Sequence, residues 1–443
     1  MPSALDAPAR PATLPSRQEA LDLLRIALAK ATAEQVAVRL HAVRHGSTRF
    51  SGNAITQNIS EEDMTLSVKA AFGQKTGQAE TNDLSGDGIA RAVARAEEIA
   101  KASAPDQEYL PPLQAQAYAA SERFDAALAA ADPELRAEWV LQAVRAAPKE
   151  FPLSGSTATR ATVTAVANSR GLTGYHRTTD ARFTVTALTP DSSGWAEGQA
   201  HEASGMDPAA LAARAVEKAR RSAAPKTLEP GIYPVILEPA AVAEYLSYLA
   251  WSMGAKPADE GRSCMTGKLG TAIASPSVTL ASDPARPGCE TVPFQGDGLP
   301  APHTRWIDGG ALKQLITSRF WGQKTGSPVT GAPTNLILEG GKASLNEMIK
   351  NTARGVLITR FWYIRFVDPM SLLLTGMTRD GLFWIEDGKV RHGLRNLRFN
   401  DSPLRTFQHV EALGPCELAG EYLPAFVPPV KVSQFTFSSQ TTF

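Results

Sequence analysis

Two long stretches in the first half of the chain alternate polar and apolar residues, and each one leads into an alanine-rich segment. The first covers residues 35–82 and precedes "GDGIARAVARAEEIAKAS"; the second covers residues 161–198 and precedes "MDPAALAARAVEKARRSAA". Alternation with a period of two predicts strands that bury one face, whereas the alanine-rich segments have helical spacing. This order predicts an α/β domain over residues 15–225, built from two related halves. Convergence of two alanine-rich helices is the alternative to a duplication.

The rest of the chain, residues 226–443, predicts a second domain that is mainly β. "LFWIEDGKVRH" contains an Asp387-Gly388 pair typical of a tight hairpin turn. One helix begins at a capping box formed by Ser344 and Glu347, and we expect Gly355 to end it. The predicted fold class is α+β, with an α/β N-terminal domain of strand meanders and helices and a mainly β C-terminal domain. Residues 1–14, which contain much alanine and proline, are expected to be a disordered tail.

The charge balance and the cysteines narrow the setting and the partners. Lys+Arg and Asp+Glu both number 45, so the chain lacks the basic excess of a protein that binds nucleic acid or an anionic membrane. Cys264, Cys289 and Cys416 are odd in number and form no C-x-x-C pair, which favours a reduced, cytoplasmic location. No run of 18 apolar residues occurs, so we expect no membrane span.

His201 and Glu202 are the first two letters of a zinc-peptidase signature. In that signature a second histidine follows one helical turn later, so that two imidazoles reach one ion while the glutamate acts on its bound water. Here the corresponding positions hold glycine and methionine. Asp207 and Pro208 are moreover a typical helix start, so the pair precedes the helix. We interpret it as part of a solvated loop.

Several longer stretches resemble one protein family. Residues 47–101, "STRFSGNAITQN…ARAEEIAK", are similar to the N-terminal domain of the TldD/TldE (PmbA) family, and "GKLGTAIASPSVTL" and "TGMTRDGLFWIEDGKV" are similar to its C-terminal domain. The resemblance covers nearly the whole chain after the tail. The resemblance implies a relation to cytoplasmic metalloproteases that act on peptides. It also implies a dimer that encloses a cavity admitting unfolded peptides. The family's older label is modulator of DNA gyrase.

The chain departs from this family at the metal site. The resemblance implies a zinc ion held by two histidines of an HExxxH helix, directly after the first strand of the C-terminal domain, and by a cysteine near the C-terminus. The matching stretch "GIYPVILEPAAVAEYLSYLAWSMGAKPADEG" offers Glu244, Tyr245 and Tyr248 but no histidine. Cys416, in "PCELAGEYLP", is a leftover ligand position. One thiolate cannot hold catalytic zinc, which requires three protein ligands.

We therefore expect a non-catalytic subunit with no cofactor of its own. It would pair with an HExxxH-bearing relative that carries the zinc, as a heterodimer, or form a homodimer, and it would contact unfolded peptides. One alternative is an active hydrolase with a site rebuilt around Cys416 from residues such as His303, His409, Cys264 and Cys289. Another is a peptide-binding scaffold without peptidase activity, which docks extended chains by strand addition.

The stretch "LLLTGMTRDGLFWIEDG" matches a region near the family's active centre. The resemblance makes Thr375, Arg379 and Asp380 candidates for polar contacts with substrate. A polar turn between two buried strands is the alternative interpretation.

A neighbouring strand, "VLITRFWYIRFV", carries basic and aromatic residues. Strand alternation places Arg360 on the same face as Trp362, and Arg365 on the opposite face. Core packing is the preferred explanation for Trp362 and Tyr363.

Overall fold

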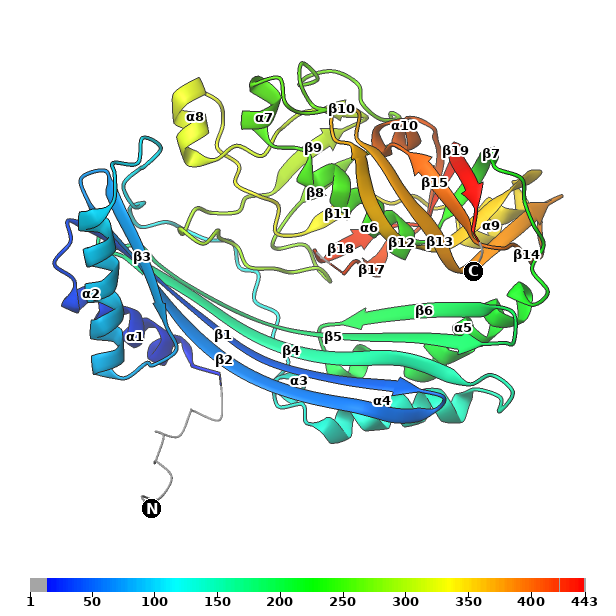
Figure 1. Ribbon diagram of the computed structural model, residues 1–443, viewed down its shortest axis with the longest axis horizontal. Coiled ribbons are helices and arrows are strands. Elements are labelled where there is room, and N and C mark those ends of the chain that lie inside the picture. Colours follow the sequence, from blue (N-terminus) through cyan, green and yellow to red (C-terminus); the bar gives the residue numbers. More distant parts are fainter. Residues whose placement is uncertain (1–13, 422, 442–443) are drawn as a thin grey trace.

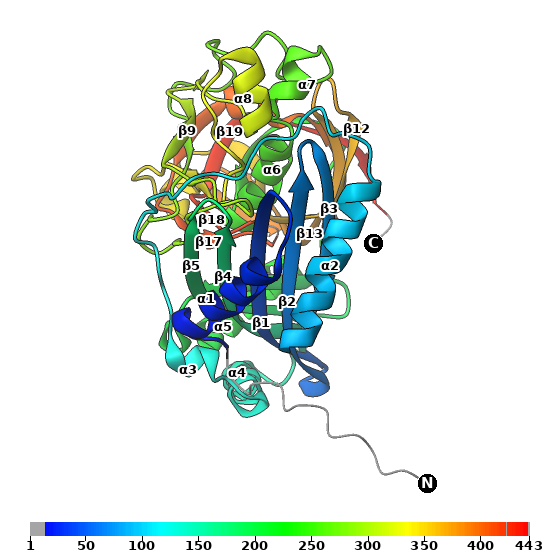
Figure 2. The ribbon, with the colours of Figure 1, turned by 90° about the vertical axis from the view of Figure 1, so that its left-hand side faces the viewer.

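A computed structural model describes residues 14–421 and 423–441, which form two regions (Figure 1). The first region is a long curved sheet with helices on its outer face. The second region is mainly β and lies over the inner face of that sheet (Figures 1 and 2). This arrangement confirms the α+β class. The predicted tail, apart from Leu14, lies outside the described residues.

The curved sheet has six antiparallel strands in the order β3-β2-β1-β4-β5-β6. This order is symmetric about the central β1–β4 pair. Along β1, burial alternates as the sequence pattern predicts, with Val36, Val38 and Leu40 buried on the helix-covered face. The strands are β1 (Gln35–Ser51), β2 (Ala54–Phe72), β3 (Lys75–Thr81), β4 (Leu153–Asn168), β5 (Thr173–Leu188) and β6 (Ser193–Ala200).

The helices of this region divide between the two halves of the sheet. The first half has α1 (Arg17–Lys30) before its strands and α2 (Gly86–Ala102) after them. The second half has α3 (Ala126–Ala129) and α4 (Pro133–Ala146) before its strands, then the 3₁₀ turn η1 (Ala203–Gly205) and α5 (Pro208–Ser222). Each half thus runs from helix through three strands to helix. Such an order is what two related halves would produce, and duplication stays a prediction.

The second region contains two sheets around one buried helix. One sheet has the order β10-β9-β8-β11-β18-β17; the other has the order β12-β7-β19-β15-β13-β14, with β16 on β19, and closes through a β12–β13 pairing. The strands are β7 (Gly231–Leu237), β8 (Leu280–Ser282), β9 (Thr304–Asp308), β10 (Ala311–Leu312), β11 (Leu336–Leu338), β12 (Arg354–Asp368), β13 (Leu373–Glu386), β14 (Lys389–Gly393), β15 (Leu397–Asp401), β16 (Val410–Leu413), β17 (Glu417–Ala419), β18 (Ala425–Val427) and β19 (Val430–Gln440). The helices are α6 (Pro239–Trp251), α7 (Ala255–Asp259), α8 (Arg319–Thr325), α9 (Leu345–Lys350) and α10 (Pro403–Gln408).

Helix α6 directly follows β7 and forms the centre of this region's core. Its sequence is apolar on almost every side, as expected of a helix enclosed by protein. Tyr245 is fully buried, and its ring lies 5.6–6.3 Å from the rings of Phe361, Phe399, Phe407 and Phe435. Aromatic rings at such separations interact favourably beyond their burial. The helix is therefore held rigidly, and only a narrow stripe of it is left to face the first region.

The local turn and capping predictions are confirmed with one exception. The capping box of Ser344 and Glu347 is present, and Asp387 and Gly388 adopt positive φ angles between β13 and β14. Gly355 does not end the helix: α9 stops at Lys350, and Gly355 lies inside β12. A side chain at this position would meet the Pro234 carbonyl of the adjacent strand, so the glycine serves close strand packing.

Within the described part of the chain, no helix combines the length and the apolar character that crossing a membrane requires.

Candidate functional site

A pocket of about 240 Å³ lies where the curved sheet meets the second region. Its walls come from β5 and β6, from α6, from β12, and from the turn between β17 and β18. The lining residues are Arg182, Trp195, Glu197, Ala240, Glu244, Tyr248, residues 360–365, Gly420 and Glu421. We call this the interdomain pocket.

Strand β6 supplies one wall because its alternate residues point to the second region. Ser193 donates a hydrogen bond of 2.6 Å to Asp380, and the Gln199 amide donates one of 2.8 Å to the Gly420 carbonyl. Trp195 and Glu197 share this face with them, since they occupy alternate positions of the same strand. The edge strand of the first region is thereby fastened to the second region on both sides of the pocket.

Helix α6 supplies the opposite wall through residues four positions apart. Ala240, Glu244 and Tyr248 lie on one helical face and all line the pocket. Tyr248 donates a hydrogen bond of 2.6 Å to the Ile364 carbonyl of β12. This bond ties the helix to the third wall, so three elements hold the pocket in shape.

Most charged groups of the pocket are paired with one another. Arg182 lies 2.8 and 3.1 Å from Glu197 and 3.7 Å from Glu421. Arg360 donates to Asp380 from two guanidinium nitrogens, one of them at 3.1 Å. The Arg182–Glu421 pair crosses between the two regions, because Arg182 belongs to β5 of the sheet and Glu421 follows β17 of the second region.

Among the carboxyl groups that line the pocket, Glu244 differs from Glu197 and Glu421. Among the described residues, its half-buried carboxyl group has no hydrogen bond and no ion pair. Burial is the main cause that raises the pKa of Glu244, to about 7; Arg360 opposes the rise, and the nearby charges of Glu421 and Glu197 favour it. The group is therefore balanced between its neutral and ionised forms near neutral pH.

Aromatic rings and guanidinium groups alternate around the mouth of the pocket. The Arg360 guanidinium lies 4.6 Å from the ring centre of Trp195, that of Arg379 lies 4.2 Å from Trp362, and that of Arg365 lies 4.0 Å from Tyr363. Such stacking holds long side chains over the rings by cation–π attraction.

A bulge in β12 explains why these aromatic side chains are open to solvent. Tyr363 has a φ of 57°, and the pairing with β13 shifts between Trp362 and Arg365. Trp362 and Tyr363 are 39% and 58% exposed, so the core-packing interpretation is wrong for both. Arg365 is exposed as Trp362 is, whereas Phe361 and Ile364 are buried. The prediction that Arg365 lies opposite Trp362 is wrong because the extra residue resets the alternation.

Two of the three predicted substrate contacts interact with residues that line the pocket, and the third lies apart. Asp380 is largely buried, pairs with Arg360 and accepts from Ser193, and it lines a neighbouring cavity. Arg379 lies over Trp362 at the mouth, and its Nε is 3.6 Å from Asp380. Thr375 lies further along β13, where it pairs with Arg365 across the strands and accepts a hydrogen bond from Arg398. Contact of any of them with substrate stays a prediction.

The residues around Cys416 do not fit a catalytic zinc ion. The Cys416 thiol is half-buried and donates to the Leu338 carbonyl, and burial raises its pKa to about 11. A single cysteine would supply only one of the three protein ligands that catalytic zinc requires. Over residues 14–421 and 423–441, no group of three or more His, Cys, Asp and Glu side chains is placed to hold a metal ion.

The other residues of the rebuilt-site alternative do not gather around Cys416. Cys264 and Cys289 are buried, and burial raises the pKa of each thiol, that of Cys289 to about 12. His303 is exposed, and His409 is half-buried after α10. The chemistry of these groups is that of core thiols and ordinary histidines.

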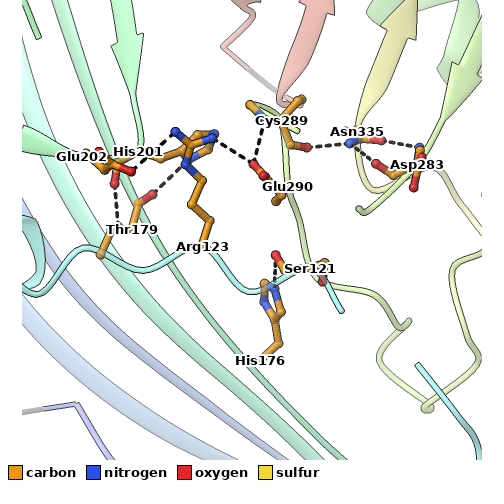
Figure 3. A network of polar contacts seen from close by, with 11 residues as sticks. Ser121, Arg123, His176, Thr179, His201, Glu202, Asp283, Cys289, Glu290 and Asn335 are labelled. Carbon is orange, nitrogen blue, oxygen red and sulfur yellow. Dashed lines mark hydrogen bonds and ion pairs between the residues drawn. The ribbon is translucent and has the colours of Figure 1, made fainter. Parts of the chain in front are cut away.

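His201 and Glu202 lie in a separate polar junction between the two regions (Figure 3). As predicted, they precede α5, whose N-cap is Asp207. His201 is not in a solvated loop, however: its Nδ1 lies 3.0 Å from the Thr179 carbonyl, and its own carbonyl accepts from the Thr179 hydroxyl. Arg123 lies 3.7 Å from Glu202 and 3.2 Å from Glu290, so it connects the sheet to the second region. The pair is structural rather than part of a metal site.

Sequence reasoning missed the sheet side of the interdomain pocket. No motif joins the residues concerned, and only tertiary packing brings them together. They are Arg182, Trp195 and Glu197 of the sheet, with Glu421 from the turn between β17 and β18. One signal was available: "SGWAEGQA" places a tryptophan and a glutamate on one strand face, which is unusual for a face that would remain in water.

Models of one protein family match this architecture over almost the whole chain. Residues 36–100 match PmbA/TldA metallopeptidase domain 1, residues 82–223 match the central domain, and residues 230–439 match the C-terminal domain. The chain belongs to the PmbA/TldA metallopeptidase family.

Solved structures share this fold across almost the whole chain. TldE from Thermococcus kodakarensis matches with a TM-score of 0.84 at 18% identity, over 94% of this chain and 99% of that one. A modulator of DNA gyrase from Thermotoga maritima matches with a TM-score of 0.83 at 19% identity, over 94% of this chain and 100% of that one. Identities this low establish the fold alone.

A metalloprotease of Methanothermobacter thermautotrophicus is 26% identical over 172 residues. The matched stretch covers 35% of this chain and 36% of that relative. The chain thus spans about a third of the length of the curated relative that it matches, and the activity of that protein does not transfer with the similarity.

Proposed function

We propose that the chain is the non-catalytic subunit of a PmbA/TldA-type peptidase complex and holds no catalytic metal itself. The observation that carries this proposal is the face of α6 turned to the pocket, which presents Ala240, Glu244 and Tyr248 and no imidazole. Catalytic zinc needs three protein ligands and an open position for water. The protonated Cys416 thiol offers at most one such ligand.

The zinc would then come from a partner with the HExxxH helix, and we propose a heterodimer with such a relative, a homodimer being the alternative assembly. The role left to this chain is to contact unfolded peptides. The interdomain pocket supports that role because it combines exposed aromatic rings with fixed charges in a concave site, as peptide-binding sites commonly do. Its rigid walls come from both regions, so it is preformed rather than assembled on binding.

Metal analysis together with a peptidase assay tests the proposal. The purified chain is expected to contain far less than one zinc per molecule and to cleave no unfolded peptide. Addition of the HExxxH-bearing relative is expected to give chelator-sensitive cleavage. Cys416→Ala is the matched control, and we expect it to change neither the metal content nor the activity of the mixture.

Two results would contradict the proposal. One is stoichiometric zinc in the chain alone that is lost in Cys416→Ala, which would restore the rebuilt-site alternative. The other is chelator-sensitive peptide cleavage by the chain without a partner. Either result can be measured without knowing which peptides the complex prefers.

A peptide-binding role without a peptidase partner is a second candidate, favoured by the edge of β12. Residues 356–358 pair with β7, whereas residues 359–368 pair only with β13 within the described chain. A free edge of this length beside a pocket can receive an extended peptide by strand addition. Slowed amide exchange over residues 359–368 on peptide binding, without co-purification of an HExxxH-bearing relative, would favour this candidate.

A further inference from the structure

The interdomain pocket contains one carboxyl group that the protein does not neutralise. Arg182 is shared between Glu197 and Glu421, and Arg360 is paired with Asp380. The remaining lining cation, Arg365, lies over Tyr363 and donates to the Ile364 carbonyl. Glu244 thus makes no ion pair and no hydrogen bond among the described residues, although it lines the same cavity as Arg182, Arg360 and Arg365.

An unpaired carboxyl group in this position has no structural use. Removing it from water costs free energy unless a partner is supplied, and a glutamine or leucine would fill the same space on α6 without that cost. The neighbouring carboxylates of Glu197 and Glu421 add to the cost rather than offset it. Within the described chain, Glu244 is thus the carboxyl group of the pocket that is left without an ion pair, even though the three arginines and three glutamates of the lining balance in number.

The shape and walls of the pocket indicate which kind of cation fits. A cavity of about 240 Å³ is roughly eight times the volume of one liquid water, enough for one long side chain or one terminal residue. Trp195, Tyr248, Trp362 and Tyr363 surround it with aromatic surface, which packs against an aliphatic stem and attracts a cation. Arg182 and Arg360 flank the carboxyl group, so a compact ammonium fits better than another broad guanidinium.

We propose that the interdomain pocket binds a primary ammonium group of a peptide, with Glu244 as its counter-charge and the aromatic rings around its aliphatic part. This inference rests on the proposed peptide-contacting function and states what the pocket recognises. The ammonium can belong to a peptide amino terminus or to a lysine side chain, and the chemistry at Glu244 is the same for both.

Calorimetric titration of the isolated full-length chain with three peptides of one apolar sequence tests this. The first peptide has a free amino terminus and no lysine, the second is N-acetylated with one internal lysine, and the third is N-acetylated without lysine. The measurement is made at pH 8, above the pKa of Glu244. At least one ammonium-bearing peptide is expected to bind about tenfold or more tightly than the third, and which one does so identifies the source.

Two variants locate the effect. Glu244→Gln is expected to abolish the preference for an ammonium, whereas Glu421→Gln should retain it, because Glu421 is 68% exposed and already lies beside Arg182. Circular dichroism verifies that both variants fold.

Equal binding of the three peptides, or a preference that survives in Glu244→Gln, would overturn the inference while leaving the proposed function intact. Loss of the preference in both variants would also overturn it, since a diffuse negative potential would then explain the binding. Absence of binding to any peptide overturns the inference as well; the metal and partner measurements decide the proposed function independently.

Discussion

The two halves of the curved sheet use the same construction but serve different neighbours. Strand β3 contains "GQAE" at residues 77–80 and β6 contains "GWAE" at residues 194–197, each paired with the preceding strand and covered by the following helix. Gly77 lies against the backbone of α2 at Ala96 and Ala100, and Gly194 lies against the backbone of α5 at Ala215 and Ala219. In both cases the two alanines are four residues apart on their helix. Each glycine thus permits the same close contact between strand and helix.

The difference lies on the other face of these two strands. In β3, Gln78 and Glu80 are exposed, and Glu80 accepts a hydrogen bond of 2.7 Å from Ser67. In β6, the matching Trp195 and Glu197 are buried against the second region and line the interdomain pocket. The side of the strand that faces the helix therefore packs in the same way in both halves. The interdomain pocket depends on residues of the opposite face.

The strongest test of this equivalence replaces each glycine by alanine. Gly77→Ala and Gly194→Ala would each place a methyl group onto helix backbone, and we expect each to lower the free energy of unfolding by about 2–3 kcal/mol. Urea denaturation measures both. Gly86→Ala is the control, because nothing lies within 4 Å of its added carbon, and it should be neutral or slightly stabilising. A large loss in only one half would show that the two contacts are not equivalent.

The second test concerns the α6 side of the pocket, which has no counterpart in the first half. Because the folded pKa of Glu244 is raised to about 7, the folded state loses stability as the pH rises from the unfolded pKa through that value. Glu244→Gln removes this loss. Above pH 8 the variant should be more stable than the wild type by on the order of 2 kcal/mol, allowing for partial exposure, and below pH 4 the difference should vanish.

Thermal unfolding at a series of pH values measures that difference. A pH-independent gain would mean that glutamine improves packing or hydrogen bonding rather than relieving an unpaired charge. A loss at pH 8 would mean that Glu244 has a partner in solution, and Glu244 would then resemble Glu202 and Glu290, which both lie close to Arg123.

The sequence predicted well those features that depend on neighbouring residues. The alternation in β1 and the capping box of Ser344 and Glu347 were readable because strand periodicity and helix caps are local. The absence of a histidine from the α6 stretch was likewise visible in the sequence alone. These local patterns defined the strands and helices, whereas the lack of a bound metal stays a prediction.

The pocket could not be predicted in the same way because its parts are joined only by tertiary contacts. Nothing in the sequence links Arg182 to Glu421, since their 3.7 Å approach depends on how the two regions dock. The bulge at Tyr363 defeated the alternation argument, because a single inserted residue reverses every later side chain of the strand. His201 failed as a solvated residue for a similar reason: its partner Thr179 lies on the adjacent strand.

The smallest effects are expected when the two matched glutamates, Glu80 and Glu197, are themselves replaced. Glu197→Gln weakens the pairing of Arg182, whereas Glu80→Gln alters an exposed group bonded to Ser67, so we expect losses of about 1 kcal/mol and below about 0.5 kcal/mol, respectively. The loss at Glu197 stays moderate because Glu421 remains near Arg182.

The comparison is best made at pH 5.5 by urea denaturation. At that pH Glu244 is mostly protonated, so removing the charge of Glu197 cannot be offset by relief of repulsion on α6. Equal losses in the two variants would indicate that β6 gains nothing from docking against the second region. A larger loss for Glu197→Gln at pH 5.5 that shrinks at pH 8 would instead place Glu197 and Glu244 in one electrostatic unit.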